Sequence, residues 1–473
     1  ELPDGATAFG TSMFSLLHAG APPDIDFDAV ARSLVLGYPT APGTALARVR
    51  QLGPGEIWQL VPHAVRRRWF CPRERLDRRR TLEASAETVD ATLRSAVRDA
   101  IPPGERVGAF LSGGLDSSIV LAHLRESGTP VEAFTLFFGD QVPGEMRYAR
   151  AVAQHLGVRH NVLEVDAKAF CAGIEPSVLH LEDVVSEAIA VPNFLLAREA
   201  ARSADALFTG EGGDQSFGGP KNVGMALAYA YAGHPAAPPL AHTYVSLHHY
   251  LWSDLGEALH PRVLEAFDPE RLAAEVGGRF FAGAYASKGR SFVGRVMLGN
   301  TVVKGGSNIL VKAAKMIGLA HDLALRSPMF DRRLVDLAFT IPPWQKADGT
   351  DEKLVLRRAA LRSLPAWVVN RPKRGMTLPL ASWFAGELGE LARDVLTERA
   401  VRQRGLLNWS YVERLLAARP TTQEHRRART ADKLWLALVT ELHHRAIDTV
   451  ARDARGRPDV RASTRAPGEA AHA

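Results

Sequence analysis

An apolar segment that breaks at two glycines constrains this chain more than any other feature. Residues 108–120 read GAFLSGGLDSSIV, in which a predicted strand turns into a predicted helix. Because Gly113 and Gly114 carry no side chains, the backbone N–H groups of the turn can surround an anion, and the new helix directs its positive end at that anion. The segment therefore predicts a polyphosphate cradle. Three hydroxyls add further donors to it: Ser112, Ser117 and Ser118.

A carboxylate lies within this cradle. Asp116 would repel a bare phosphate, but it suits a nucleotide whose phosphates are bridged by a divalent cation such as Mg²⁺. The chain contains no G-x-x-x-x-G-K-[ST] motif, and the turn holds no lysine, so this is not a Walker A loop. The alternative is a turn that uses glycine for geometry alone. The full string between an apolar strand and an apolar helix disfavours that alternative.

A second glycine-rich turn follows the predicted strand 206–209. It reads Gly210, Glu211, Gly212, Gly213, Asp214. Two carboxylates close to a triphosphate require a cation, so Asp214 and Asp116 could together hold one Mg²⁺. Glu211 would then act as a base or orient an incoming amine. The alternative is an acidic surface turn.

A third candidate lies in a cationic loop, residues 370–376, which read NRPKRGM. Cleavage of a phosphoanhydride bond in the bound polyphosphate would build negative charge on the bridging oxygen and on the departing phosphate group. A cation aimed at that point acts where the charge develops, and Lys373 is the candidate. The alternative is a solvated lysine in a basic loop.

The apolar pattern predicts the fold class. Strands are expected at 107–111, 131–138, 159–165 and 206–209, with helices between them. Such a β-α-β series is typical of an α/β fold, a parallel sheet with helices on both faces and a ligand at the carboxyl ends of the strands. Both glycine turns then fall on one rim of the sheet. Beyond Gly219 the pattern is mainly helical to about Ile447, so one domain is predicted over 81–449.

Length and composition fit a soluble protein of two domains. The chain has 473 residues, 46% of them hydrophobic and 23% charged. Residues 1–80 alternate short apolar segments with Gly and Pro, which predicts strands and turns rather than long helices. Residues 450–473 are polar and rich in Arg, Gly, Pro and Ala, so we expect disorder there. The sequence has no membrane span and no export signal at its start, which favours the cytoplasm. Two cysteines without a C-x-x-C pair support neither a disulfide framework nor a zinc site.

The net charge of +6 comes mainly from clustered arginines. Such clusters could contact RNA, but acidic residues are interspersed and no RNA-binding motif is present. The charge therefore favours a solvated face rather than a nucleic-acid partner.

Taken together, these motifs resemble known enzymes. The turn at 112–118 is similar to the PP-loop of the ATP pyrophosphatases (adenine nucleotide alpha hydrolase-like), which split ATP between its α and β phosphates. From about Thr81 to Leu442 the chain resembles the synthetase domain of glutamine-dependent asparagine synthetases. Four motifs occur in the family's order: 112–118, 210–219, the RSPMFD segment 326–331, and the RPK segment 371–373.

The resemblance implies a set of roles. The adenosine would be framed by Leu111, Leu136, Thr209 and Gly210. Asp116 and Asp214 would bind Mg²⁺. Glu211 and Lys373 would serve formation of the acyl-adenylate and its attack by ammonia.

The chain also departs from the family pattern. Members with glutaminase activity begin with a cysteine, whereas residue 1 here is Glu. Residues 1–80 are too short for a whole glutaminase domain, so we expect them to be the remnant of a β-rich glutaminase-like (Ntn-type) domain, with such a domain or subunit possible upstream. On the acceptor side four positions differ: Gln215 replaces Glu, Phe137 replaces Gly, Ala324 replaces Glu, and the segment 312–315, KAAK, lacks the usual Asp.

The leading hypothesis is an ATP-dependent amide ligase. It adenylates a small-molecule carboxylate, foremost the aspartate side chain, releases pyrophosphate and passes the acyl group to ammonia, giving asparagine and AMP. One alternative is an amide or macrolactam synthetase similar to lasso-peptide cyclases, which uses a substrate amine. Others are a tRNA-modifying PP-loop protein and a non-catalytic nucleotide-binding paralogue. A homodimer is possible.

Overall fold

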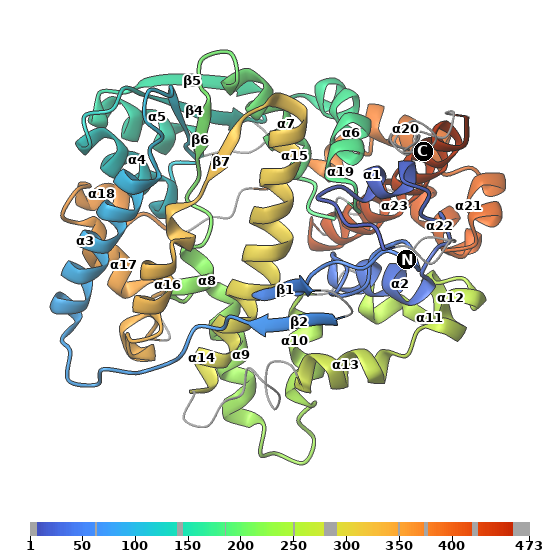
Figure 1. Cartoon of the computed structure of the whole chain (residues 1–473), viewed down its shortest axis with the longest axis horizontal. Coiled ribbons are helices and arrows are strands. Elements are labelled where there is room, and N and C mark those ends of the chain that lie inside the picture. The colour runs from blue at the N-terminus through green and yellow to red at the C-terminus, as the bar shows by residue number, and fades with distance from the viewer. Residues whose placement is uncertain are drawn as a thin grey trace, which may run out of the picture.

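A five-stranded parallel sheet organises one half of the molecule (Figure 1). The computed structural model describes residues 7–61, 64–139, 145–184, 186–248, 251–278, 291–348, 351–372, 377–418 and 424–456. The strand order is β5-β4-β3-β6-β7. From the central strand β3 the chain adds β4 and then β5 on one side, and it then crosses over to add β6 and β7 on the other side. The carboxyl ends of β3 and β6 lie at this change of direction, which is where open α/β sheets bind ligands. The strands are β3 Val107–Phe110, β4 Val131–Phe137, β5 Arg159–Glu164, β6 Ala206–Phe208 and β7 Ala324–Arg326.

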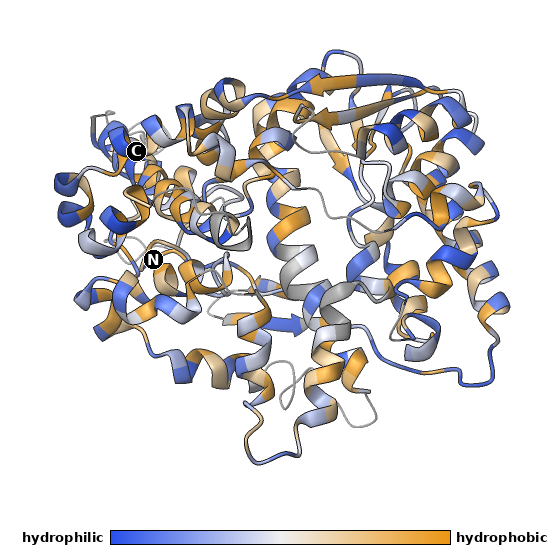
Figure 2. Ribbon diagram, turned by 180° about the vertical axis from the view of Figure 1, so that it is seen from behind, coloured by the Kyte–Doolittle hydropathy of each residue, from blue (hydrophilic) through white to orange (hydrophobic). Residues whose placement is uncertain are grey.

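The alternation of side chains along the strands builds a core on each face of the sheet. On β6, Ala206 and Phe208 pack with helices α3, α4 and α17, whereas Leu207 packs with α6 and α7 on the opposite face. This period of two is what a sheet buried on both sides requires. The predicted α/β class, with helices on both faces, is confirmed. In Figure 2 the strands of the five-stranded sheet carry orange stretches, while the outer helices carry blue stretches.

Helices make up most of the remainder. Those flanking the sheet are α3 Leu82–Ala100, α4 Leu115–Glu126, α5 Glu145–Leu156, α6 Ala167–Leu181, α7 Ala190–Ala200, α8 Gly213–Phe217, α15 Lys312–His321, α16 Arg332–Ala338, α17 Leu354–Ala360 and α18 Ala366–Val369. The others are α9 Pro220–Tyr231, α10 Leu240–His248, α11 Leu255–Ala258, α12 Pro261–Ala266, α13 Pro269–Gly277, α14 Phe292–Gly299, the π-helix η3 Asn300–Val311, α19 Leu380–Trp383, α20 Glu387–Val395, α21 Glu398–Arg404, α22 Trp409–Leu416 and α23 Glu424–Gly456. Short 3₁₀ turns lie at η1 Trp252–Asp254, η4 Pro328–Phe330 and η5 Pro343–Gln345.

Residues 1–80 differ from the strands and turns predicted for them. A hairpin, β1 Glu56–Val61 with β2 Ala64–Trp69, is present, but two helices precede it, α1 Met13–His18 and α2 Phe27–Leu36. Asp26 caps α2 by accepting a hydrogen bond from the backbone N–H of Ala29 at 2.9 Å, and Gly37 ends it at φ +82°. These local signals outweigh the Gly and Pro content. Both helices pack into the same hydrophobic cluster as α6 and α23. The predicted domain boundary at residue 80 stays a prediction.

Two further elements were not expected from the sequence, helix α6 and the edge strand β7. Helix α23 also continues to Gly456, so the disorder expected from about Ala451 does not begin there; residues 457–473 lie outside the described residues. Within the described part of the chain, no helix combines the length and the apolar character needed to cross a bilayer.

Candidate active site

The first glycine turn is closed by its own hydroxyls. The backbone N–H of Ser112 donates to Ser117 Oγ at 3.2 Å, and that of Gly114 donates to Ser112 Oγ, also at 3.2 Å. Gly113 has φ +70°, and a Cβ there would lie 2.5 Å from the backbone N of Ala149. Only glycine satisfies both the dihedral angle and the close approach. The turn is therefore a preformed loop at the start of α4.

The second glycine turn lies directly against the first. A Cβ on Gly210 would come within 2.5 Å of the backbone C of Asp116 and the backbone N of Ser117. A Cβ on Gly213 would lie 2.3 Å from Asp116 Oδ1. The glycines of the second turn are thus required because the first turn occupies the space that side chains would need. The predicted convergence of the two turns at one rim of the sheet is present in the fold.

A buried ammonium group joins the two predicted metal ligands. Lys353 Nζ forms an ion pair with Asp116 Oδ2 and a second ion pair, at 2.5 Å, with Asp214 Oδ1. The lysine side chain is 6% exposed. Burial lowers the pKa of Lys353, but the charges and hydrogen bonds of the two carboxylates outweigh it and raise that pKa above its usual value. Lys353 is therefore a permanent cation at the junction of the two turns.

This geometry fits the Mg²⁺ that the motifs imply. Asp116 and Asp214 already contact a single cation, so their oxygens converge on one point, and carboxylate oxygens are ligands that Mg²⁺ prefers. No cluster of three or more His, Cys, Asp or Glu residues suited to a metal occurs among the described residues. Two carboxylates are sufficient for an ion whose other ligands are substrate phosphates and water.

Glu211 is a buried carboxyl group with a perturbed pKa. Burial, reinforced by the charges of Asp214 and Asp116, raises its pKa to about 7, against the lowering effects of a hydrogen bond from Gln215 and the charge of Lys353. A group of this kind changes its protonation state near neutral pH. It can therefore accept a proton from an amine under physiological conditions.

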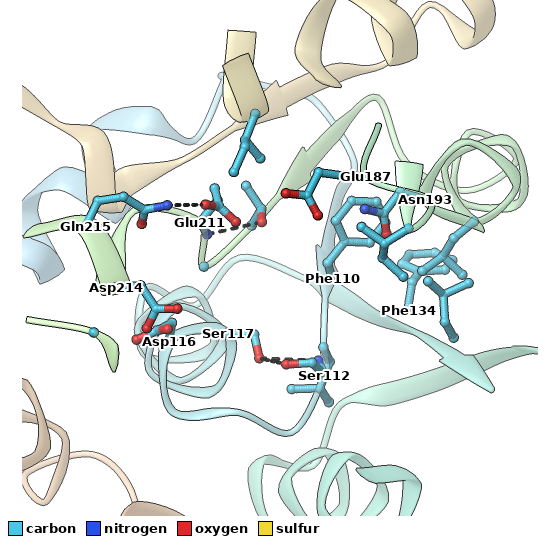
Figure 3. Close-up of a pocket in the computed structure, with 18 of the residues that line it drawn as sticks. Phe110, Ser112, Asp116, Ser117, Phe134, Glu187, Asn193, Glu211, Asp214 and Gln215 are labelled. Atoms are coloured by element: carbon cyan, nitrogen blue, oxygen red, sulfur yellow. Dashed lines mark hydrogen bonds between the residues drawn. The ribbon is translucent and has the colours of Figure 1, made fainter. Parts of the chain in front are cut away.

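A cavity of about 530 Å³ is lined by residues of both glycine turns (Figure 3). Its volume is in the range of ligand sites. Apolar side chains form one side, including Phe110, Phe134 and Leu196. Of the predicted site residues, it is lined by Leu111, Ser112, Asp116, Ser117, Leu136, Thr209, Gly210, Glu211 and Asp214.

Three other residues of the predicted site do not line this cavity, and a fourth is not described by the structure. Gly113 and Gly114 do not line it, and Ser118 is fully buried behind the turn, with no partner for its Oγ in the described structure. Lys373 lies outside the described residues. The ligand roles of all the predicted residues remain predictions.

Two basic residues at the site were not assigned from the sequence. Lys353 precedes α17 in a left-handed conformation, φ +57°, and nothing in the pattern of an amphipathic helix start signals that geometry. The guanidinium of Arg371 stacks over Tyr148 at 4.8 Å, and a Cβ on Gly114 would lie 3.4 Å from Arg371 Nη2. The RPK motif, residues 371–373, could have indicated Arg371 from the sequence, because Arg371 is its first residue.

Part of the cavity lining is acidic and amide-rich. Glu187, Asn193 and Asn300 line it, and among the lining residues that the structure describes none is Lys or Arg. Two lysines on α15, the helix that follows η3, form ion pairs with carboxylates of the same chain. Lys312 pairs with Asp183, and Lys315 pairs with Glu182 at 2.6 Å.

Comparison with known proteins identifies the family. The family model described as asparagine synthase matches residues 88–445, which is more than half of the chain. The chain belongs to the asparagine synthase family. It is 24% identical over 471 residues to asparagine synthetase [glutamine-hydrolyzing] 1 of Bacillus subtilis strain 168, covering 92% of this chain and 71% of that protein. It is 29% identical over 476 residues to a putative asparagine synthetase [glutamine-hydrolyzing] of Mycobacterium bovis, covering 93% and 71%.

Among solved structures, the chain is similar to the NMN synthetase of Francisella tularensis, with 16% identity and a TM-score of 0.23 over 51% of this chain and 94% of that one. As a member of the asparagine synthase family, the protein is an asparagine synthase-like carbon–nitrogen ligase.

Proposed function

We propose that this protein is an AMP-forming amide ligase that works in two steps at one cavity. In the first step a carboxylate oxygen attacks the α-phosphorus of ATP. The new O–P bond gives an acyl-adenylate, and the bond to the bridging oxygen breaks, so pyrophosphate leaves with the electron pair. Asp116 and Asp214 would hold Mg²⁺, which neutralises charge on the phosphates when bound.

In the second step a nitrogen nucleophile attacks the acyl carbon. The N–C bond forms, the C–O bond to the phosphate breaks, and AMP leaves with the electron pair. Glu211 takes a proton from the nitrogen, a role that its pKa of about 7 suits. AMP is a far better leaving group than oxide, which is why activation lowers the barrier.

One observation carries the proposal. The carboxylates of Asp116 and Asp214, nearly a hundred residues apart in the sequence, both contact the ammonium group of Lys353 where the two glycine turns meet. A scaffold protein without catalysis would not require this convergence beside a buried carboxyl with a raised pKa. Lys373 is proposed as a further cation for the departing pyrophosphate.

The acid proposed first is the side chain of aspartate, with ammonia as the nucleophile, a choice supported by relatives that are named asparagine synthetases. The product would be asparagine. A second candidate is an acid that carries its own amine, giving an intramolecular or intermolecular amide such as a macrolactam. The acidic part of the cavity lining supports this candidate, because Glu187 and Glu211 suit an amine better than a second carboxylate.

The test is exchange of labelled pyrophosphate into ATP, run with a panel of acids that contains aspartate, its α-amide and ω-amino acids. We expect exchange that depends on both the acid and Mg²⁺. Fast exchange with aspartate supports asparagine synthesis, and preference for an amine-bearing acid without a second carboxylate supports the second candidate. The absence of exchange with every acid, by folded protein, would refute the ligase proposal.

A further inference from the structure

Gln215 is a buried amide in the cavity wall to which the two-step chemistry above assigns no role. It lies on α8, one residue after Asp214, and is 9% exposed. Its Nε2 donates a hydrogen bond to Glu211 Oε1 at 2.6 Å (Figure 3). A bond this short between an amide and a carboxylate is charge-assisted. The carboxylate also determines which end of the amide faces it, because the carboxamide oxygen would be repelled there.

Backbone of a neighbouring helix also lies close to the Gln215 side chain. Gly305 belongs to the π-helix η3, and a Cβ at that position would lie 2.6 Å from Gln215 Cγ and 2.7 Å from its Nε2. The helix backbone therefore packs directly on the amide. Segments of π-helix occur frequently at functional sites. The Gln215 side chain therefore has η3 close to it as well as its hydrogen bond to Glu211, and both limit its freedom to turn away.

The backbone of Glu211 has its own anchors, but its carboxylate depends on Gln215. Ser327 Oγ donates to the carbonyl oxygen of Glu211 at 2.5 Å, and the Glu211 N–H donates to Thr209 Oγ1 at 3.2 Å. Among the described residues, the hydrogen bond from Gln215 is the only one to the carboxylate itself. Removal of the amide would thus free the side chain without disturbing the turn.

We propose that Gln215 is a positioning residue for the amide-forming step, holding the Glu211 carboxylate in the orientation that receives the proton of the attacking nitrogen. This inference rests on the proposed function. Gln215 exchanges no atom with the substrate and acts only through Glu211. It therefore has no role in adenylation, in which Glu211 takes no proton.

The test separates the two half-reactions in Gln215→Met, which keeps the volume and removes the donor. Gln215→Asn is the second variant, because its shorter amide withdraws the donor while the site stays polar. Adenylation is measured by pyrophosphate exchange and amide formation by hydroxamate production from hydroxylamine, both with aspartate or with the panel acid that exchanges fastest. We expect amide formation to fall about tenfold and exchange to change less than about twofold.

Gln345→Met is the matched control. Gln345 is also a buried amide, 5% exposed, whose Nε2 donates to a carbonyl oxygen, that of Arg80, at 2.6 Å, but it does not line the cavity. This variant should leave the ratio of amide formation to exchange unchanged. A parental ratio in both Gln215 variants would overturn the inference alone. A parent protein that shows no exchange would overturn the proposed function, and the inference with it.

Discussion

Two buried lysines at the two ends of one short loop have opposite surroundings. The loop between Lys346 and Lys353 closes through a bridge between Ala347 and Glu352, and the Leu354 N–H donates to the carbonyl oxygen of Lys346 at 3.0 Å. Lys353 meets two carboxylates at the junction of the glycine turns. Lys346 points into an apolar cluster instead.

The partners of Lys346 are weak. Its Nζ lies 3.4 Å from the thioether sulfur of Met297 and 5.9 Å from the centre of the Phe339 ring, and the residue is 2% exposed. Burial lowers the pKa of Lys346 to about 7, with only a distant carboxylate, Glu74, acting against it. Burial alone therefore does not determine the charge of a lysine. The carboxylates at the active site keep one ammonium charged, and their absence lets the other become neutral.

The largest effect should come from removal of a partner of Lys353. Asp116→Ala deletes both a predicted Mg²⁺ ligand and one side of the ion pair, so we expect pyrophosphate exchange to fall by at least about a hundredfold. Lys373→Ala should have an effect of similar size if it stabilises the departing pyrophosphate. Parental exchange in both variants would show that the site assignment is wrong.

The next effect is on stability and distinguishes the two lysines by sign. Lys353→Met leaves two carboxylates facing each other without their shared cation, which should lower the free energy of unfolding by about 2 kcal/mol at pH 7. Urea unfolding followed by circular dichroism measures it. Stability equal to that of the parent would mean that solvent, rather than Lys353, compensates these carboxylates.

Lys346→Met should have the opposite effect. A thioether side chain fills the apolar site without a charge to desolvate, so we expect a gain of about 1 kcal/mol at pH 7. Between pH 7 and 10.5 the unfolded chain binds the lysine proton that the folded chain has lost, so the parent becomes more stable as pH rises through this window. The gain should therefore shrink at pH 9.5. A constant gain at both pH values would contradict a neutral Lys346.

The smallest effect concerns pH and activity. Because the pKa of Glu211 is about 7, the amide-forming step should accelerate as pH rises through 7 and the carboxylate loses its proton. Single-turnover amide formation from preformed acyl-adenylate would report it. Lys346→Met should leave the midpoint in place, since Glu211 is influenced by Lys353 and not by Lys346. A flat profile between pH 6 and 8 would argue against Glu211 as the base.

The short-range features of the fold were predictable. Strands β3, β4, β5 and β6 lie within one residue of their predicted ranges. Strands β3, β4 and β6 are mainly apolar runs, whereas β5, RHNVLE, is mostly polar and is the outermost strand on its side of the sheet. Strand β7 was missed because three residues, Ala324–Arg326, carry no recognisable pattern and become a strand only by pairing with β6. Helix α2 was missed because Gly and Pro around it suggested turns.

The sequence by itself determined the local form of the two glycine turns and the reactive groups that they carry. Glycines, hydroxyls and carboxylates at fixed spacings identified the cradle, the second turn and Glu211, since these depend on residue type and on local backbone geometry. Only the tertiary structure decided which side chains meet. It placed Lys353 between Asp116 and Asp214, Gln215 against Glu211, and Lys346 among apolar groups. The physical reason is that charge and hydrogen bonding act through space over a few ångströms, whereas the sequence records only neighbours along the chain.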